Sequence, residues 1–377
     1  MEFRDLKQQY QMLKQDIDQA VFKVMHNANF ISGAEVIELE EQLANYVGVN
    51  HCITCGNGTD ALVLSLQTMQ VKQGDAVFVP DFTFFASAEA PAICGATPVF
   101  VDVDADTYNM SAVSLENAIQ MVLEEGKLQP KVIIAVDLFG QPADYIAIRE
   151  IATKYNLLIL EDGAQGFGGM IGDKRACRFG DIATTSFFPA KPLGCYGDGG
   201  AVFTDREDWA EIIRSLRIHG KGKDKYDNVR IGMNSRLDTM QAAILQVKLK
   251  AFEEYELKKV NEVAAYYTEK LKDVAKTPVI KDGFYSSWAQ YTIRLADERQ
   301  RDEIQRKLKE KGIPSMIYYK KAMHEQGAFS KQVTVEKLYR DYKVNELTST
   351  VLSIPLSPYI TRKEQDKVVD VITKWRL

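Results

Sequence analysis

The first half of the chain alternates short apolar runs with stretches in which apolar residues recur at helical spacing. The apolar runs predict strands at 52–54, 76–79, 98–103, 132–137, 157–161, 183–188 and 201–204. Helical patterns follow the first two strands, at 60–66 and 87–93. Strands that alternate with helices in this way are typical of a mostly parallel β-sheet covered by helices. The predicted fold class is therefore α/β.

The pattern changes after Arg236. The run 237–260 contains few helix breakers, and its apolar residues Met240, Ile244 and Val247 recur at helical spacing. Helices are also predicted at 258–271, 298–311 and 363–374, and a strand at 291–295. We expect the long helical run to connect a large domain, residues 1–250, to a smaller C-terminal α/β domain, residues 251–377. A chain of 377 residues is long enough to form two such cores.

Composition narrows the class of protein. A hydrophobic content of 46% with 26% charged residues is typical of a soluble globular protein. A net charge of −5 argues against nucleic acid as a partner, because nucleic-acid surfaces need a concentrated basic face. No apolar run approaches the length that spans a bilayer, and the charged N-terminus has no apolar signal region. We therefore expect a cytoplasmic protein with no membrane partner.

Five cysteines are scattered along the chain, at positions 52, 55, 94, 177 and 195. Cys52 and Cys55 have the spacing of a redox motif, but they also fit small buried residues of a strand that leads into a glycine turn. Neither a second cysteine pair nor a nearby histidine pair completes a tetrahedral metal site. The sequence predicts neither a metal site nor a disulfide.

Two side chains in the middle of the chain are those that pyridoxal phosphate requires. Asp162 directly follows the apolar strand 157–161, and Lys191 lies between a proline turn and the glycine-rich segment 194–200. The cofactor needs an amine for its covalent Schiff-base link and a carboxylate that faces its pyridine nitrogen. Asp162 also fits a helix N-cap, and Lys191 a surface loop, although apolar and proline residues flank the lysine. We predict a pyridoxal-phosphate enzyme with Lys191 and Asp162 as its catalytic residues.

Other residues fit the rest of such a cofactor. Gly58 and Thr59 lie in a turn between a strand and a helix, where backbone amides attract a phosphate, although such turns also serve as ordinary helix caps. Ser186, shortly before Lys191, is a second candidate for the phosphate. Gln165 is a candidate contact of the ring hydroxyl. Phe84 is either a ring stacked on the cofactor or an ordinary core residue.

Four motifs together resemble the DegT–StrS family of sugar-nucleotide aminotransferases. They are the segments 161–165, 186–194, 197–200 and 234–238. The resemblance runs essentially end to end, from 30–36 to 352–356. It implies the aspartate-aminotransferase-like fold, which is fold type I of pyridoxal-phosphate enzymes, and a homodimer with two composite active sites. It also implies transfer of an amino group from an amino acid, with L-glutamate as the expected donor, to a keto-sugar nucleotide.

The resemblance assigns roles to individual residues of this chain. Lys191 matches the lysine that binds the cofactor, Asp162 the partner of the pyridine nitrogen and Gln165 the contact of the ring hydroxyl. Phosphate contacts and the stacking aromatic, often Tyr or Trp in the family, are implied at Gly58, Thr59, Ser186 and Phe84. Asn234 matches a residue that the opposite subunit lends to the phosphate, which would make the dimer a requirement for catalysis.

The expected substrate is a UDP-3-keto-2-acetamido sugar or uronate. The segment 187–200 is similar to that of enzymes that aminate UDP-2-acetamido-3-oxo-glucuronate with glutamate, and Tyr318, Tyr319 and His324 fall where the family contacts its sugar. The chain departs from the family at 320–323, where two lysines replace a proline-rich run, and at Ser357, where many members carry His. These lysines fit either an anionic substrate or a solvated charge pair.

Two arginines are candidates for recognition of a carboxylate or diphosphate. Arg230 precedes the last motif and Arg236 lies within it, and a guanidinium binds either anion in bidentate fashion. Structural ion pairs are the alternative for each.

Other functions stay open beside the leading one. A sugar dehydratase of the same fold would carry histidine in place of the cofactor-binding lysine, whereas Lys191 is present here. A non-catalytic regulator that binds the cofactor is disfavoured because the chain has no appended helix-turn-helix. An aminotransferase that acts on a cyclitol, an amino-aromatic precursor or a TDP-keto-deoxysugar is the remaining alternative. At the level of the family we expect a role in surface polysaccharide biosynthesis, such as that of lipopolysaccharide O-antigen.

Overall fold

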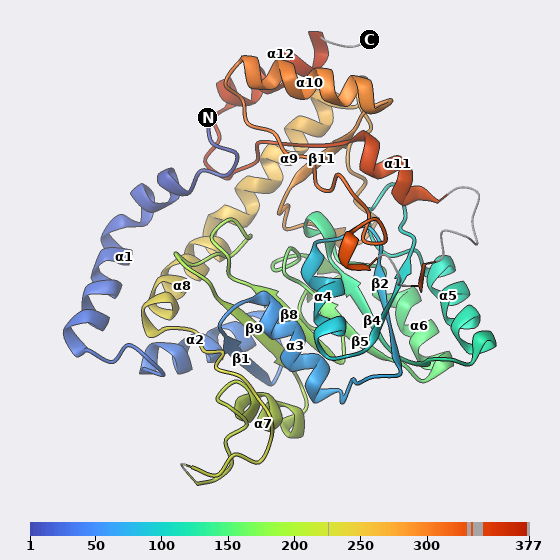
Figure 1. Cartoon of the computed structure of the whole chain (residues 1–377). Helices are drawn as coiled ribbons and strands as arrows, with labels where there is room; N and C mark the ends of the chain where they lie inside the picture. The colour runs from blue at the N-terminus through green and yellow to red at the C-terminus, as the bar shows by residue number, and fades with distance from the viewer. Residues whose placement is uncertain (225, 330–332, 335–341, 375–377) are drawn as a thin grey trace.

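A mixed β-sheet forms the centre of the molecule in the computed structural model, which describes residues 1–224, 226–329, 333–334 and 342–374 (Figure 1). Within these residues, eight strands have the order β1-β9-β8-β5-β4-β2-β3-β12. Their bounds are β1 His51–Cys55, β2 Asp75–Pro80, β3 Thr97–Val101, β4 Gln129–Val136, β5 Leu158–Asp162, β8 Ile182–Ser186, β9 Gly200–Thr204 and β12 Val333–Thr334. The strands from β8 to β12 in this order are parallel, and β9 is antiparallel to both of its neighbours. The prediction of a mostly parallel sheet is confirmed.

Helices cover the sheet and flank it. Their bounds are α1 Leu6–Asn27, α2 Ala34–Val47, α3 Gly58–Thr68, α4 Phe85–Ile93, α5 Ala112–Glu125, α6 Tyr145–Tyr155 and α7 Glu207–Leu216. In Figure 1, α3 and α4 lie in front of the central strands, and α5 and α6 lie to the right of β2 and β4. Helix α1 runs beside α8. The predicted helices 60–66 and 87–93 correspond to α3 and α4.

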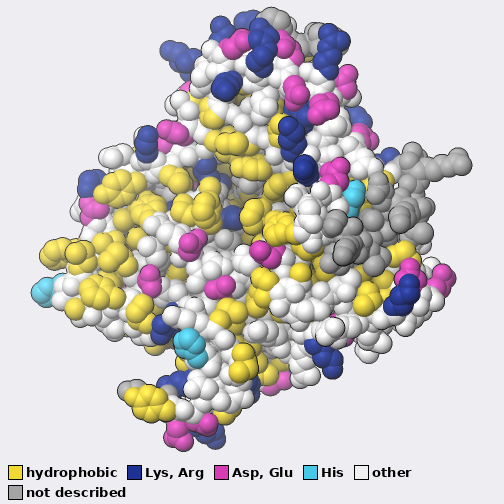
Figure 2. Space-filling model, viewed as in Figure 1, with side chains coloured by type: hydrophobic (Ala, Val, Ile, Leu, Met, Phe, Trp, Pro, Cys, Tyr) yellow, Lys and Arg dark blue, Asp and Glu magenta, His cyan; other side chains and the backbone are white. Residues whose placement is uncertain are grey.

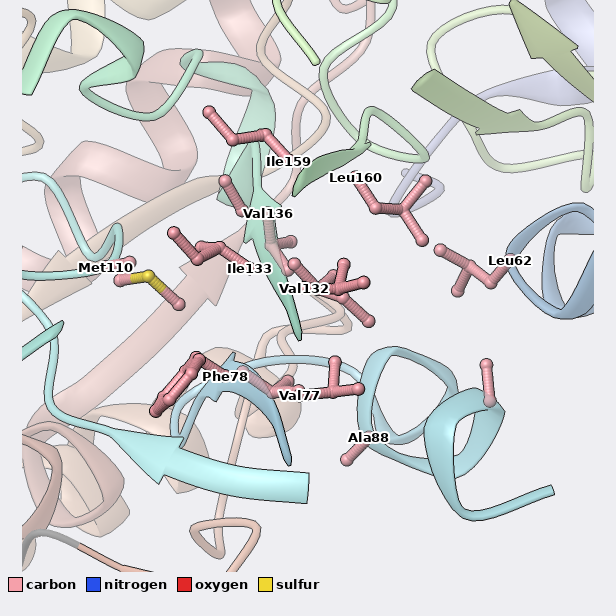
Figure 3. Packing of buried hydrophobic residues seen from close by; sticks show 14 of the residues in the cluster. Leu62, Val77, Phe78, Ala88, Met110, Val132, Ile133, Val136, Ile159 and Leu160 are labelled. Atoms are coloured by element: carbon pink, nitrogen blue, oxygen red, sulfur yellow. The ribbon is translucent and has the colours of Figure 1, made fainter. Parts of the chain in front are cut away.

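The core of the large part lies around β4 and β5 (Figure 3). Ile133 of β4 and Ile159 of β5 are fully buried, and Leu62 of α3 packs against the same group. Central parallel strands are covered on both faces, so β4 and β5 contain the continuous apolar runs 132–136 and 158–160. The register aligns Val136 with Asp162, and Asp162 with Thr184, so the carboxyl ends of β4, β5 and β8 meet at one edge.

A nearly continuous helical rod connects the sheet to the C-terminal part. It consists of α8 Thr239–Ala251, a single π-helical turn Phe252–Glu256 and α9 Leu257–Leu271. The prediction of an unbroken helix over 237–260 is therefore corrected by one wide turn. The Phe252 ring at this turn packs so closely on Gly168 that a Cβ there would lie 2.5 Å from it. Single π-turns inside α-helices are uncommon.

The C-terminal part has its own hydrophobic cluster. Its strands and helices after α9 are β10 Phe284–Tyr285, β11 Tyr291–Arg294, α10 Glu298–Glu310, α11 Lys343–Thr350, β13 Val351–Ile354 and α12 Arg362–Lys374. Tyr267, Ile293, Leu308 and Val368 are buried together between α9, β11, α10 and α12. β11 pairs with β13, and the two-residue strands β6 Met170–Ile171 and β7 Lys174–Arg175 form a small sheet with β10. The division at residue 250 stays a prediction.

Two further findings concern membranes and metals. None of the helices in the described part of the chain is both long and apolar enough to cross a bilayer. Among the same residues, His, Cys, Asp and Glu side chains form no group of three that could hold a metal ion. The five cysteines are free thiols.

Candidate active site

A cavity of about 690 Å³ opens at the edge where the parallel strands β4, β5 and β8 end. Ligands of open α/β sheets bind at this edge. Nine of the residues singled out from the sequence line the cavity: Gly58, Thr59, Phe84, Asp162, Gln165, Ser186, Lys191, Tyr318 and Tyr319. The fold therefore brings together side chains from segments that are far apart in the sequence.

Asp162 is the last residue of β5 and is 4% exposed. Its Oδ2 accepts a hydrogen bond of 2.7 Å from the Ser87 hydroxyl, and its Oδ1 accepts one of 3.2 Å from the Ala164 amide. Burial raises the pKa of Asp162, whereas these two donors and the charge of Lys191 lower it. The result is a buried carboxylate, fixed in orientation, that favours a positively charged partner.

Lys191 lies in the loop that follows β8. Its backbone amide donates to the Phe188 carbonyl at 2.9 Å, and its Nζ lies 6.0 Å from the centroid of the Phe84 ring. No described residue hydrogen-bonds this Nζ. Burial lowers the pKa of Lys191, and the charge of Asp162 opposes that effect. Lys191 therefore presents an amine that loses its proton more easily than a free lysine does.

The third corner of the cavity is the start of α3. Asn57 caps this helix by accepting a hydrogen bond of 2.8 Å from the Asp60 amide. A Cβ on Gly58 would lie 2.7 Å from the Cβ of Ser186 and 3.2 Å from its Oγ, so only glycine lets the serine approach the helix end. Backbone amides at a helix N-terminus, together with a hydroxyl, form a site for a phosphate.

The opposite wall carries aromatic residues. The Tyr319 hydroxyl accepts a hydrogen bond of 3.1 Å from Gln165 Nε2, and Gln165 Oε1 accepts one of 2.9 Å from the Phe139 amide. The Phe84 and Tyr319 rings lie 6.4 Å apart, and Phe84 is 54% exposed toward the cavity side. Gln165 is thus held in place by the wall that carries Tyr319. Its predicted contact with a ring hydroxyl stays a prediction.

Four predicted site residues lie outside the lining of this cavity. His324 contacts the Asp81 carboxylate through Nδ1, and its backbone amide donates to Asp81 at 2.8 Å. Arg230 is exposed, and its Nη1 donates to Ser215 Oγ at 3.2 Å. Asn234 is exposed and Arg236 half-buried. The fold of one chain does not bring these four side chains to Lys191.

Several lining residues were not predicted from the sequence. Ser87 holds Asp162, and it lies three residues after Phe84 at the start of α4, on the same helix face, a spacing that could have indicated it. Asp198 and Gln290 also line the cavity, and Gln290 Oε1 is buried without a hydrogen-bond partner within the described residues. Next to the cavity, Ser235 Oγ donates to Asp60 at 2.6 Å and accepts from the Gly56 amide at 2.8 Å.

These residues fit pyridoxal phosphate. The cavity offers a buried carboxylate for the ring nitrogen, an amine for the aldehyde, an aromatic face and a helix start for the phosphate. Lys191, Asp162, Phe84 and the Gly58 turn would hold the group.

Comparison with known proteins identifies a family of aminotransferases. The model of the DegT/DnrJ/EryC1/StrS aminotransferase family matches residues 11–373. A UDP-2-acetamido-2-deoxy-3-oxo-D-glucuronate aminotransferase from Pseudomonas aeruginosa is 44% identical over 362 residues, which are 96% of each chain.

Solved structures are similar over the whole length. A DegT DnrJ EryC1 StrS aminotransferase from Brucella abortus has a TM-score of 0.96 and 46% identity, and the match covers 100% of this chain and 99% of that one. The NtdA protein of Bacillus subtilis, solved with bound cofactor PMP, has a TM-score of 0.86 and 27% identity, covering 96% of this chain and 82% of that one. The fold predicted from the resemblance is confirmed.

Proposed function

Because the chain belongs to the DegT/DnrJ/EryC1/StrS aminotransferase family, we propose that it transfers the amino group of L-glutamate to a UDP-3-keto-2-acetamido sugar, and specifically to a uronate. It is a pyridoxal-phosphate-dependent aminotransferase. The observation that carries the proposal is the convergence of Lys191, Asp162 and the start of α3 in one cavity. The similarity to the Pseudomonas aeruginosa relative supports the choice of sugar.

The chain's own residues supply binding, orientation and proton transfer. When bound, pyridoxal phosphate supplies an electron sink for charge that develops at the carbon bearing the amino group. Asp162 stabilises positive charge at the ring nitrogen, and Ser87 keeps the carboxylate in its orientation. The Lys191 amine accepts the proton from Cα of the amino donor, and its lowered pKa makes the uncharged form more available than in a free lysine. A hydrogen bond between Gln165 and Tyr319 orients these two side chains on the cavity wall opposite α3.

Cationic side chains outside the cavity are the candidates for recognition of an anionic substrate. Among its described lining residues, Lys191 is the only Lys, Arg or His side chain. A uronate carboxylate and a diphosphate therefore need cations from outside the lining. Lys320 and Lys321 are exposed directly after Tyr319, and Arg230 lies on an exposed loop. We assign carboxylate or diphosphate recognition to these side chains, with Arg230 and Arg236 acting from a second copy of the chain.

A direct assay with several acceptors tests the proposal. Purified enzyme is given L-glutamate and one of three acceptors: the UDP-3-keto-2-acetamido uronate, its neutral 3-keto counterpart and a TDP-keto-deoxysugar. We expect equimolar 2-oxoglutarate and amino sugar, with kcat/KM for the uronate at least about tenfold above that for the neutral sugar, because one well-placed ion pair contributes on the order of 1.4 kcal/mol. Absence of 2-oxoglutarate with every acceptor contradicts the proposal. A deoxy-keto sugar formed without amine transfer supports the dehydratase alternative.

We also propose that the enzyme works as a homodimer whose sites are shared. Exposed apolar side chains gather on and beside α1 and α2, where Figure 2 shows broad hydrophobic areas; they are Met12, Phe22, Met25, Phe30, Ile31 and Ile37. The loop that follows α7 protrudes from the body in Figure 1 and carries Val229 and Ile231, which are 53% and 92% exposed. Surfaces of this kind are typical of interfaces between subunits. Asn234, beside this loop, would then reach the partner's cavity.

Mixed dimers test the shared site. Lys191→Ala and Asn234→Ala chains are inactive or weakened alone, and co-refolding them pairs a native lysine with a native asparagine in one site of each mixed dimer. We expect the mixture to recover up to about a quarter of the wild-type activity. If Asn234 serves its own chain, the mixture shows only the average of the two separate activities, and the shared site is wrong.

A further inference from the structure

The residues before α1, called here the N-terminal segment (1–5), contact the loop that carries the catalytic lysine. Arg4 Nη2 donates a hydrogen bond of 3.1 Å to the carbonyl oxygen of Pro192, the residue after Lys191. The Phe3 carbonyl accepts one of 3.1 Å from the Leu356 amide. The Phe3 ring lies edge-on to Tyr318, with centroids 6.2 Å apart. The segment therefore touches the lysine loop and the Tyr318 wall of the cavity at the same time.

The guanidinium of Arg4 is only partly neutralised. Its Nη1 is buried without a hydrogen-bond partner among the described residues. Glu256 is the carboxylate that faces it, but Glu256 Oε1 already accepts from Gln9 Nε2 at 2.8 Å and from the Tyr359 hydroxyl. A second cation, Lys248, lies nearby and is 1% exposed. Burial lowers the pKa of its ammonium to about 8, the charge of Glu256 opposes this effect, and the charge of Arg4 adds to it. Arg4 and Lys248 therefore both interact with the charge of one carboxylate, that of Glu256.

The charge of Arg4 acts on Lys191. Burial is the main cause that lowers the pKa of Lys191, and the charge of Arg4 lowers it further. Asp162, at the end of β5, raises it. Arg4 from the N-terminal segment and Asp162 from the sheet are the charged groups that face the amine, and they act in opposite directions.

We propose that Arg4 is a positioning residue for Lys191. Its guanidinium fixes the backbone directly after the lysine through the Pro192 carbonyl, and it keeps a positive charge behind the amine. The guanidinium suits this place because one of its nitrogens binds the carbonyl while the group keeps its positive charge. The inference rests on the proposed role of Lys191 and adds a residue that the family motifs in this sequence do not include.

The first test uses the protein free of cofactor. Arg4→Met, Arg4→Lys and, as a matched control, Lys7→Met are treated with acetic anhydride over a range of pH, and acetylation of Lys191 is followed by mass spectrometry. Lys7 lies in the first turn of α1, with its side chain 86% exposed. We expect Arg4→Met to move the midpoint for Lys191 upward by about half to one pH unit, because a facing positive charge is lost. Arg4→Lys, which keeps the charge, and Lys7→Met should stay near the wild type.

The second test uses the enzyme with cofactor and L-glutamate. We expect Arg4→Met to lower kcat roughly tenfold, with KM for glutamate changed less than twofold, because a displaced lysine affects the chemical step. Arg4→Lys should lie between Arg4→Met and the wild type. It should also show faster hydrogen exchange in the 187–197 loop, since it loses the guanidinium nitrogen that donates to the Pro192 carbonyl. If Arg4→Met does not fold, the loop exchange and the kcat of Arg4→Lys alone test the proposal.

Two results overturn the inference. One is a wild-type acetylation profile and a wild-type kcat in Arg4→Met. The other is an Arg4→Lys variant whose loop exchange and kcat both equal those of the wild type. If the wild-type enzyme itself fails to consume glutamate, the proposed function is wrong, and the acetylation experiment still reports on Arg4 separately.

Discussion

Replacing Lys191 by alanine will remove amino transfer from L-glutamate, with a fall in kcat of at least about 10³-fold. The reason is that one amine performs two tasks at this position. In the proposed mechanism it is the nucleophile of the cavity, and it is also the base that moves the proton at Cα of the donor. No other Lys, Arg or His side chain lines the cavity in the described part of the chain. Steady-state formation of 2-oxoglutarate measures the loss.

A matched lysine controls for this change. Lys127→Ala removes an ammonium whose side chain is 78% exposed, outside the cavity lining, and should leave kcat within twofold of the wild type. The fold of both variants is checked by their unfolding midpoints. A Lys191→Ala enzyme that keeps more than a tenth of its activity would remove this lysine from the mechanism.

Asp162→Asn has the second largest expected effect, a fall in kcat of about 10²–10³-fold, comparable to removing one well-placed electrostatic contact from an active site. Asparagine has the shape of aspartate and retains an oxygen for the Ser87 hydroxyl. It lacks the negative charge that stabilises a protonated ring nitrogen. Burial raises the pKa of Asp162, so the carboxylate depends on its donors and on a cationic partner to remain ionised. Kinetics with L-glutamate measure the effect.

The cofactor's absorbance separates this electrostatic effect from a loss of binding. Asp162→Asn should still bind pyridoxal phosphate, with an altered spectrum, whereas Asp173→Asn, an exposed aspartate in the turn between β6 and β7, should match the wild type in both respects. If Asp162→Asn retains full kcat, the carboxylate does not face the ring nitrogen.

The central strands could be predicted from the sequence because burial on both faces makes them continuous apolar runs. β4 and β5 are examples, and their predicted ends at 132–137 and 157–161 differ by a few residues from Gln129–Val136 and Leu158–Asp162. The first helices were not predicted. α1 buries only Gln9, Ile17 and Val24 against the rest of the chain, so its apolar pattern is weak. α2 does carry apolar residues at helical spacing, so this helix could have been predicted from the sequence.

Some residues of the site could likewise be predicted from the sequence, and others could not. Lys191, Asp162 and the Gly58 turn are placed by local motifs, so their chemistry is readable from the sequence. Ser87 and Arg4 act on residues 75 and 188 positions away, and only the fold shows these contacts.

The positions of the residues assigned to the substrate were harder to predict from the sequence. His324 was expected at the sugar, yet its ring is held by Asp81, 243 positions away in the sequence. Such tertiary pairing leaves no local signal. Tyr318 and Tyr319, in contrast, line the cavity, and their contact with the sugar stays a prediction.

The most direct test of the central claim is the absorbance spectrum of the purified protein with pyridoxal phosphate, recorded before and after addition of L-glutamate. The account predicts a visible band that requires Lys191, disappears on addition of glutamate and yields one 2-oxoglutarate per site. A band that glutamate leaves unchanged, or that forms equally well in Lys191→Ala, would contradict it.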